Sequence, residues 1–163
     1  MSASPEVEEL LDRWQAGWSG RERDAFSVAC APNVHYEDPV TVQPLEGVPA
    51  IVKHARLLQR MFPDVLLERT GERLTDGQYV AAPCKVLGTH RGEIEGLPPT
   101  GRFIVVHVVF YCELDAARER LRRVRAFFDA YDAAVQLGVL PARGTFGERA
   151  LLMLRGFGLR SRT

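Results

Sequence analysis

One carboxylate stands where the sequence pattern changes from strand to helix. The stretch RVRAFFDAY, residues 123–131, alternates like a strand, turns aromatic, and carries Asp129 directly after Phe127 and Phe128. Asp129 could cap a helix that starts at Ala130, because Asp side chains accept hydrogen bonds from the first free backbone N–H groups. It could also act as a general acid or base, because burial behind two phenylalanines would raise the pKa of a carboxyl group.

Other polar residues in otherwise apolar segments are candidates for the same site. His107 lies in the apolar run FIVVHVVFYCEL. It could be a hydrogen-bonded core residue, or it could polarise a carbonyl or orient an acid. Asp38 lies three residues after His35 beside a proline loop, where turn hydrogen bonding is the simpler role. His90 could be a loop residue or a pocket residue.

The usual motifs of metal, phosphate and nucleophile chemistry are missing from the sequence. It contains no HExxH pair, no His-x-His pair, no glycine-rich phosphate loop and no GxSxG elbow. We therefore do not expect a metal site. Cys30, Cys84 and Cys112 form no CxxC motif and lie among apolar residues. They are interpreted as reduced core thiols of a cytoplasmic protein rather than as nucleophiles.

The elements that must position these residues fall into a helical part and a strand-rich part. Apolar spacing and capping residues predict helices over 5–18 (capped by Ser4), 24–30, from Gly47 to Phe62, over 130–137, and from about Phe146 to Phe157. Alternation predicts a short strand over VHYEDP and then four strands at about 65–74, 78–89, 102–114 and 121–128. Asp76-Gly77 predicts a tight turn between the first two of these four.

Segregated helices and antiparallel strands indicate the α+β class. We expect one domain over residues 1–163, with a core at about 5–141 and a helical extension at 142–163. Both faces of the 102–114 strand are mostly apolar, so this strand is predicted to be covered on both sides. A bent sheet around a helix leaves a conical cavity, in which scattered polar groups become binding-site candidates.

Composition argues against several classes of partner. Lys+Arg and Asp+Glu both number 21, so the chain gives no reason to expect nucleic acid or anionic lipid as a partner. No apolar run approaches the roughly 18–20 residues of a membrane span, and the acidic N-terminus does not resemble a signal peptide. Zero net charge does little to oppose self-association, and the segment RALLMLRGF has more apolar residues than one helix face needs. We therefore expect a homodimer.

Three stretches resemble the SnoaL-like polyketide cyclase family of the nuclear-transport-factor-2-like superfamily. They are DPV…LEGVPAIVKHARLLQRMFPDV, GTHRGEIEGLPPTGR and FFDAYDAAVQLGVLP, which together span about residues 34–141. The resemblance implies a cone-shaped curved antiparallel or mixed sheet around N-terminal helices, a homodimer, and a deep apolar pocket for a small hydrophobic molecule. It also implies ring closure by intramolecular aldol condensation without a cofactor, with Asp129 as general acid–base and His107 assisting.

Further residues are expected to bind the substrate. Arg125 shares the strand face of Asp129, so it could stabilise an enolate oxygen or pair with Asp129 instead. The segment LPPT, residues 97–100, is expected to form the pocket rim, because two prolines cannot join a strand ladder. The full expected set is Trp14, Trp18, His35, Tyr36, Phe62, His90, Leu97, Arg125 and Phe127.

Two features depart from the family pattern. The hairpin ELDAARERLRR replaces a shorter turn, and GTFGERALLMLRGFGLRSRT continues beyond the usual end. The superfamily also holds isomerases, epoxide hydrolases and non-catalytic binding modules, so fold does not settle function. The open alternatives are a cyclase, another enzyme of this superfamily, a module that binds a hydrophobic metabolite, and a structural dimer module.

Overall fold

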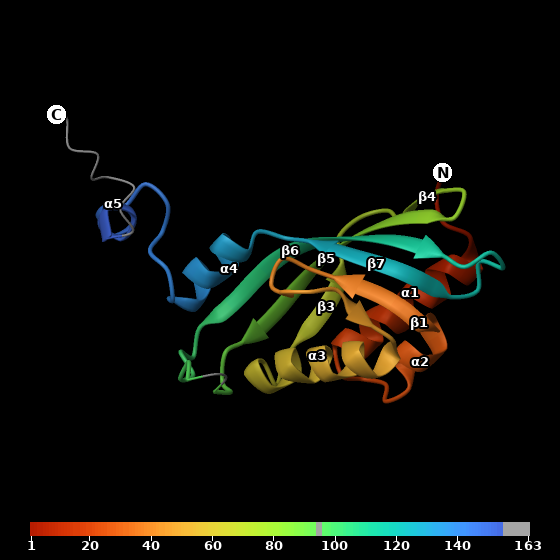
Figure 1. Ribbon diagram of the computed structural model, residues 1–163, viewed down its shortest axis with the longest axis horizontal. Coiled ribbons are helices and arrows are strands. Elements are labelled where there is room, and N and C mark those ends of the chain that lie inside the picture. The colour runs from red at the N-terminus through yellow and green to blue at the C-terminus, as the bar shows by residue number, and fades with distance from the viewer. Residues whose placement is uncertain (94–95, 155–163) are drawn as a thin grey trace.

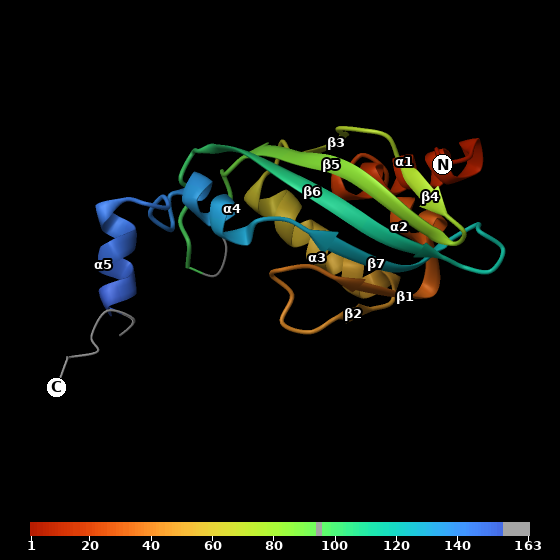
Figure 2. The same ribbon diagram turned by 90° about the horizontal axis from the view of Figure 1, so that it is seen from above.

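A computed structural model describes residues 1–93 and 96–154 of the chain. The helices are α1 (Pro5–Trp18), α2 (Ala25–Ala29), α3 (Val48–Met61), α4 (Ala130–Leu137) and α5 (Phe146–Leu154). The strands are β1 (Cys30–Glu37), β2 (Leu45–Glu46), β3 (Leu66–Arg69), β4 (Leu74–Asp76), β5 (Tyr79–Thr89), β6 (Phe103–Leu114) and β7 (Leu121–Phe127). A curved sheet has α1, α2 and α3 on one side (Figures 1 and 2). The expected α+β class is confirmed.

The sheet is mixed because its first long strand runs parallel to its last. The strand order is β2-β1-β7-β6-β5-β3, and β4 pairs with β5. The strands β5, β6 and β7 form the expected antiparallel meander, whereas β1 pairs in parallel with β7. The single strand predicted over 65–74 is two strands, because β3 and β4 pair with different parts of β5.

Helix α1 fills the concave side of the sheet with aromatic side chains. Ser4 caps it as predicted, accepting a hydrogen bond of 3.5 Å from the Val7 N–H. The Trp14 ring lies 5.6 Å from Trp18 and 5.7 Å from Phe110 of β6, measured between centroids, in edge-to-face contacts. Such pairs add about 0.5–1.5 kcal/mol each to the burial of the rings, so this cluster fixes α1 against the sheet.

Helix α3 is tied at its end to the segment that follows β5. The backbone N–H groups of Arg91 and Gly92 donate to the Met61 carbonyl at 2.9 and 3.1 Å. A Cβ atom at position 92 would lie 1.8 Å from the Arg60 carbonyl oxygen, so only glycine allows this approach. The glycine of the GTHRG stretch therefore holds the C-terminal end of α3 against the β5–β6 connection.

The expectation that β6 is covered on both faces is wrong for the described residues. Side chains at even positions from Ile104 to Leu114 are buried beneath the helices, whereas Phe103, His107, Val109 and Tyr111 on the other face are exposed. Because both faces of β6 are apolar in the sequence, hydrophobicity alone cannot tell which face is buried and which is exposed. The sheet therefore presents an apolar outer surface.

Free cysteines and apolar side chains make up the core, as expected. Cys30, Cys84 and Cys112 are buried and unpaired. Burial raises the pKa of the Cys30 thiol to about 12 and that of the Cys84 thiol to about 11, so neither is a reactive thiolate at neutral pH. None of the helices in the described ranges is both long and apolar enough to cross a membrane.

The two C-terminal helices differ in how they contact the rest of the chain. The helix α4 ends at Gly138, whose φ of 80° provides the expected left-handed cap. The helix α5 starts at Phe146, and the Thr145 hydroxyl accepts from the Glu148 N–H at 3.4 Å. It projects away from the sheet (Figures 1 and 2), with Phe146 and Leu154 exposed. The predicted helix end at Phe157 lies outside the described residues.

Candidate functional site

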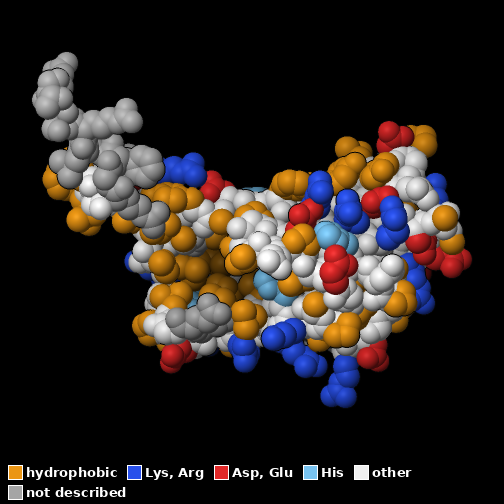
Figure 3. All heavy atoms as spheres, viewed as in Figure 1, with side chains coloured by type: hydrophobic (Ala, Val, Ile, Leu, Met, Phe, Trp, Pro, Cys, Tyr) orange, Lys and Arg blue, Asp and Glu red, His pale blue; other side chains and the backbone are white. Residues whose placement is uncertain are grey.

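A cavity of about 240 Å³ lies between the concave face of the sheet and α3. It opens as an apolar hollow on the molecular surface (Figure 3). Its lining is almost entirely apolar and comes from α1, β1, α3, β3, β5, β6, β7, α4 and the segments beside them. The residues are Trp18, Tyr36, Asp38, Val40, His54, Leu57, Leu58, Met61, Phe62, Val65, Leu67, Val86, Ile104, Val106, Val108, Phe110, Ala126, Phe128, Ala133 and Leu137.

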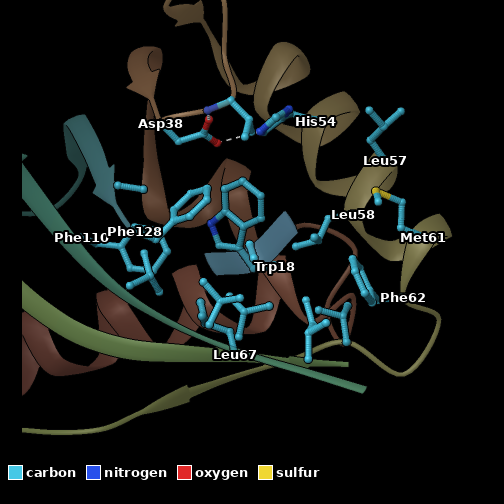
Figure 4. Close-up of a pocket in the computed structure, with 18 of the residues that line it drawn as sticks. Trp18, Asp38, His54, Leu57, Leu58, Met61, Phe62, Leu67, Phe110 and Phe128 are labelled. Carbon is cyan, nitrogen blue, oxygen red and sulfur yellow. Dashed lines mark hydrogen bonds and ion pairs between the residues drawn. The ribbon is translucent and has the colours of Figure 1, made fainter. Parts of the chain in front are cut away.

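The cavity lining contains one group of connected polar side chains. The Asp38 Oδ2 atom lies 2.8 Å from the His54 Nε2 atom, and it accepts a hydrogen bond of 2.9 Å from the Tyr36 hydroxyl. Figure 4 shows Asp38 and His54 facing each other at one end of the cavity, with Trp18 below them. Among the described residues of the lining, Asp38 is the only acidic residue and His54 the only histidine.

Asp38 is held in place by the turn that follows β1. Its Oδ1 atom accepts from the backbone N–H groups of Val40 and Thr41, both at 2.9 Å, which confirms the predicted turn role. Its side chain is only 4% exposed. Burial by itself would raise the pKa of Asp38, but hydrogen bonds from His54, the Val40 N–H and Tyr36 outweigh it and lower the pKa. Asp38 is therefore a carboxylate at neutral pH.

The charge on Asp38 determines which ring nitrogen of His54 carries a proton. A carboxylate only accepts hydrogen bonds, so the His54 Nε2 atom that faces it is the donor. In the neutral ring this leaves Nδ1 as the acceptor. Across the described ranges, Nδ1 has no hydrogen-bond partner and is not among the buried polar atoms that lack one. His54 thus presents an available base next to an apolar cavity.

Tyr36 stabilises the pair of Asp38 and His54 through its hydroxyl group. Burial, followed by the negative charge of Asp38 and their shared hydrogen bond, raises the pKa of the Tyr36 hydroxyl well above its ordinary value. The hydroxyl therefore stays protonated and keeps donating to Asp38. The rings of Tyr36 and Trp18 each lie 5.9 Å from the His54 ring, so aromatic contacts restrict the orientation of the imidazole.

The lowered pKa of Asp38 predicts a specific dependence of stability on pH. The unfolded chain binds a proton at Asp38 near its ordinary pKa of 3.8, more readily than the folded chain does, so this contribution to stability is present above that pH. It is lost as pH falls through the lower folded pKa. Asp38→Asn should lower the free energy of unfolding by roughly 1–3 kcal/mol at pH 7 and by less at pH 3.

Urea unfolding of both proteins at the two pH values measures this difference. The same pair of measurements in a His54→Gln background removes any contribution from the charge of the imidazole. An equal loss of stability at both pH values would contradict the assignment of the ionised form to the folded Asp38.

Three residues expected to bind the substrate line the cavity: Trp18, Tyr36 and Phe62. Trp14 lies behind Trp18 in the core and does not reach the cavity. His90 is fully buried beside the cavity wall, with its ring 5.6 Å from that of Phe62. Its Nδ1 atom accepts from the Thr100 N–H at 3.1 Å, which ties down the connection between β5 and β6. Leu97 is half-buried in that connection and is not a lining residue.

Four residues expected at the site lie on the outer face of the sheet. His107 and Phe127 are exposed on that face of β6 and β7. Arg125, also exposed, pairs with Glu37 of the neighbouring β1 and not with Asp129. His35 lies on β1 next to Tyr36, so it points to the opposite face, where it contacts Glu46 at 2.6 Å. Strand alternation therefore places these side chains outside the cavity.

Asp129 is the helix cap that its position suggested. Its Oδ1 atom accepts from the Asp132 N–H at 2.9 Å. Its side chain is 50% exposed and lies 3.2 Å from the Arg143 guanidinium. The expectation of burial behind the two phenylalanines is wrong, because Phe128 lines the cavity while Phe127 and Asp129 point outward. The catalytic role that the resemblance implies for Asp129 stays a prediction.

His54 was missed in the sequence, although a signal for it exists. The inward face of α3 includes Ile51, Ala55 and Leu58, and His54 falls between them at helical spacing. It is the one titratable residue on this face. A single polar residue in an apolar helical stripe is a signal that it has a partner, and the Asp38 turn offers a carboxylate as that partner.

Within 1–93 and 96–154, no three His, Cys, Asp or Glu side chains lie together in an arrangement that could hold a metal ion. The Asp38–His54 pair supplies two candidate ligands, and its other neighbours in the lining are aromatic or aliphatic. The chemistry available to these residues is therefore proton transfer and hydrogen bonding.

The fold is similar to that of several solved structures. A candidate SnoaL-like polyketide cyclase from Jannaschia sp. CCS1 matches with a TM-score of 0.74 at 20% identity, covering 87% of this chain and 99% of that one. A candidate polyketide cyclase from Acidithiobacillus ferrooxidans matches with a TM-score of 0.71 at 26% identity, covering 85% and 98%. A protein with a ketosteroid isomerase-like fold from Catenulispora acidiphila matches with a TM-score of 0.66 at 18% identity, covering 84% and 95%.

Sequence comparisons assign the family. No curated protein matches the chain. The family model described as SnoaL-like polyketide cyclase matches residues 8–137, which include most of α1, all of α2 to α4 and each strand from β1 to β7. The match runs over the whole cavity lining, from Trp18 to Leu137. On this evidence, the chain belongs to the SnoaL-like polyketide cyclase family.

Proposed function

We propose that the chain is a cofactor-independent acid–base enzyme that acts on a small apolar carbonyl compound. The reaction we favour is intramolecular ring closure of a polyketide-type substrate. The single observation that carries the proposal is the His54–Asp38 pair, whose 2.8 Å contact leaves Nδ1 available in an otherwise apolar cavity. A catalytic base fixed by a carboxylate is the arrangement that proton transfer needs.

The proposed reaction needs only one proton carrier. His54 Nδ1 takes a proton from the carbon next to a carbonyl group, and the electron pair of that C–H bond forms an enolate. The enolate carbon attacks a second carbonyl of the same molecule, which makes the C–C bond. The new alkoxide oxygen then takes the proton back from His54. The Asp38 carboxylate stabilises the imidazolium between the two steps, and atoms and charge balance without a co-reactant.

The apolar lining supports the same chemistry in two ways. It favours binding of an apolar substrate, because binding removes apolar surface of both the protein and the substrate from water. It also keeps the medium around Asp38 and the developing enolate poor in water, where a fixed charge acts more strongly. The proposed substrate is limited in size by the cavity volume of about 240 Å³.

Proton exchange tests the proposal without knowledge of the natural substrate. β-Tetralone is an apolar bicyclic ketone whose protons next to the carbonyl exchange slowly with heavy water, which proton NMR follows. The protein should accelerate this exchange at catalytic concentration, and a His54→Gln variant should not. A protein that binds β-tetralone without accelerating exchange would be a binding module, which is the alternative function. A protein that does neither would contradict both.

We also propose that the chain forms a homodimer through the outer face of the sheet. Phe103 and Phe127 are 60% and 57% exposed there, and the ring of the exposed Tyr111 stacks on that of Tyr79 at 5.7 Å. Apolar patches of this kind on a soluble protein mark interaction sites. The exposed apolar residues of α5, Leu152 to Leu154, are a second such surface.

Light scattering after gel filtration should give the mass of a dimer at micromolar concentration. Phe127→Glu should shift the protein towards monomer, because it places charges next to each other across the interface. Arg118→Glu, in the turn between β6 and β7, changes charge away from the apolar face and serves as the control. A monomeric mass for the unchanged protein across a wide concentration range would contradict the proposal.

A further inference from the structure

A row of three cations runs along α3 on the side that faces away from the sheet. Lys53, Arg56 and Arg60 are exposed and line a shallow groove on the surface of this helix. In the described part of the chain, none of them has an ion pair with an acidic side chain. Figure 3 shows Lys and Arg side chains gathered over α3, beside the hollow of the cavity. Because the net charge of the chain is zero, this row is a local excess of positive charge.

Leu57 connects the cation row with the cavity. It lines both the cavity and the shallow groove. On a helix, residues three and four positions apart are neighbours. Lys53 and Arg60 are therefore adjacent to Leu57 on one side, whereas His54 and Met61, which line the cavity, are adjacent on the other. A molecule that extends out of the cavity across Leu57 meets the cations next.

We propose that the natural ligand carries an anionic group, such as a carboxylate or phosphate, which lies outside the cavity on Lys53 and Arg60. This inference rests on the proposed function, because it assumes that the apolar part of the ligand occupies the cavity. It specifies the substrate class as an apolar carbonyl compound with an acidic tail.

The charges also fix the direction in which such a ligand enters. One end of the cavity carries the ionised Asp38, which is already satisfied by four hydrogen-bond donors. A second anion there would be repelled and would lose its water without gaining a donor. The cations at the rim attract the same group. The ligand therefore binds with its apolar, reacting end in the cavity beside His54 and its anion on Lys53 and Arg60, outside the cavity on the exposed side of α3.

Two ligands of the same carbon number, of which one is charged, test the inference. Octanoate ends in a carboxylate and octanol in a neutral hydroxyl, and each can be measured by displacement of the neutral fluorescent dye N-phenylnaphthylamine from the cavity. At low ionic strength we expect octanoate to bind about three- to tenfold more tightly than octanol, and this ratio to shrink with added salt. In the double variant Lys53→Glu, Arg60→Glu, octanoate should bind more weakly than octanol.

The outcomes separate this inference from the proposed function. Binding of both ligands with equal affinity at low salt would overturn the anion site and leave the cavity as a binding site. A preference for octanoate that persists in the double variant would also overturn it, because other cations would then hold the anion. If neither the dye nor either ligand binds, the cavity is not a ligand site, and both the proposed function and this inference are contradicted. Arg118→Glu, in the turn after β6, makes half of this change in total charge away from α3 and should keep the preference for octanoate.

Discussion

His54→Gln is expected to lower catalysed proton exchange at a bound ketone by roughly two to four orders of magnitude, the usual contribution of a general acid–base group. Glutamine keeps an amide N–H that can still donate to Asp38, so the buried carboxylate retains a partner. It has no group that takes up a proton near neutral pH. The free energy of unfolding should therefore change little while the exchange rate falls.

Asp129→Asn provides the matched control for His54→Gln. Asparagine caps helices about as well as aspartate, so the hydrogen bond to the Asp132 N–H should persist and stability should remain close to that of the unchanged protein. Because Asp129 is half-exposed and outside the cavity lining, we expect exchange at a nearly normal rate. A loss of two or more orders of magnitude in Asp129→Asn, with His54→Gln still active, would instead assign the acid–base role to Asp129.

A pH profile adds a readout that distinguishes a base from a merely structural residue. The exchange rate should depend on pH, because only a neutral imidazole can accept the proton. Asp38→Asn should alter this profile, because the neutral amide no longer stabilises the imidazolium. A variant that only loosens the cavity would lower the rate at every pH by a similar factor.

The fold could be predicted from the sequence because its periodicities are strong. The spacing of Val7, Leu10, Leu11, Trp14 and Trp18 defines α1, and all five are buried. The strands β5, β6 and β7 and the turn at Asp76-Gly77 follow from alternation and turn chemistry. The division of 65–74 into β3 and β4 could not be predicted, because it depends on where each strand pairs along β5.

The site was harder to predict because strand alternation defines two faces without saying which is concave. Arg123, Arg125 and Phe127 lie on one face of the last strand, and Asp129 follows its end as the cap of α4. The aromatic character of Phe127 suggested that this face points inward, but Ala126 and Phe128 are the residues that line the cavity. For the same reason His107 was expected in the cavity, whereas it lies on the outer face of β6. An outer face that is itself apolar removes the contrast on which such assignments depend.

The pair of His54 and Asp38 depends on a contact between residues sixteen positions apart, across a loop. Asp38 was considered for its turn, and that role is correct. Its second role appears only when α3 packs over the end of β1 and brings His54 to the same oxygen that Tyr36 contacts. Sequence spacing alone does not contain this information, because the loop between the two residues includes β2 and determines the geometry.

Val108→Phe is expected to weaken binding of N-phenylnaphthylamine by about ten- to hundredfold, because forcing a ligand into an overpacked space costs about 1–3 kcal/mol. Val108 lines the cavity from the inner face of β6. A phenyl ring at this position would occupy part of the space of about 240 Å³. Since that space is otherwise unfilled, the larger side chain should leave the melting temperature of the free protein unchanged or raise it.

Val109→Phe is the control for Val108→Phe, because it makes the same change one residue along the same strand. Val109 lies on the outer face and is exposed, so a phenyl ring there does not enter the cavity. Dye binding should match that of the unchanged protein. Fluorescence titration of the three proteins gives the two affinity ratios, and thermal unfolding shows that each variant is folded. Equal affinity of Val108→Phe and Val109→Phe for the dye would mean that the dye binds elsewhere, and the cavity would lose its place as the ligand site.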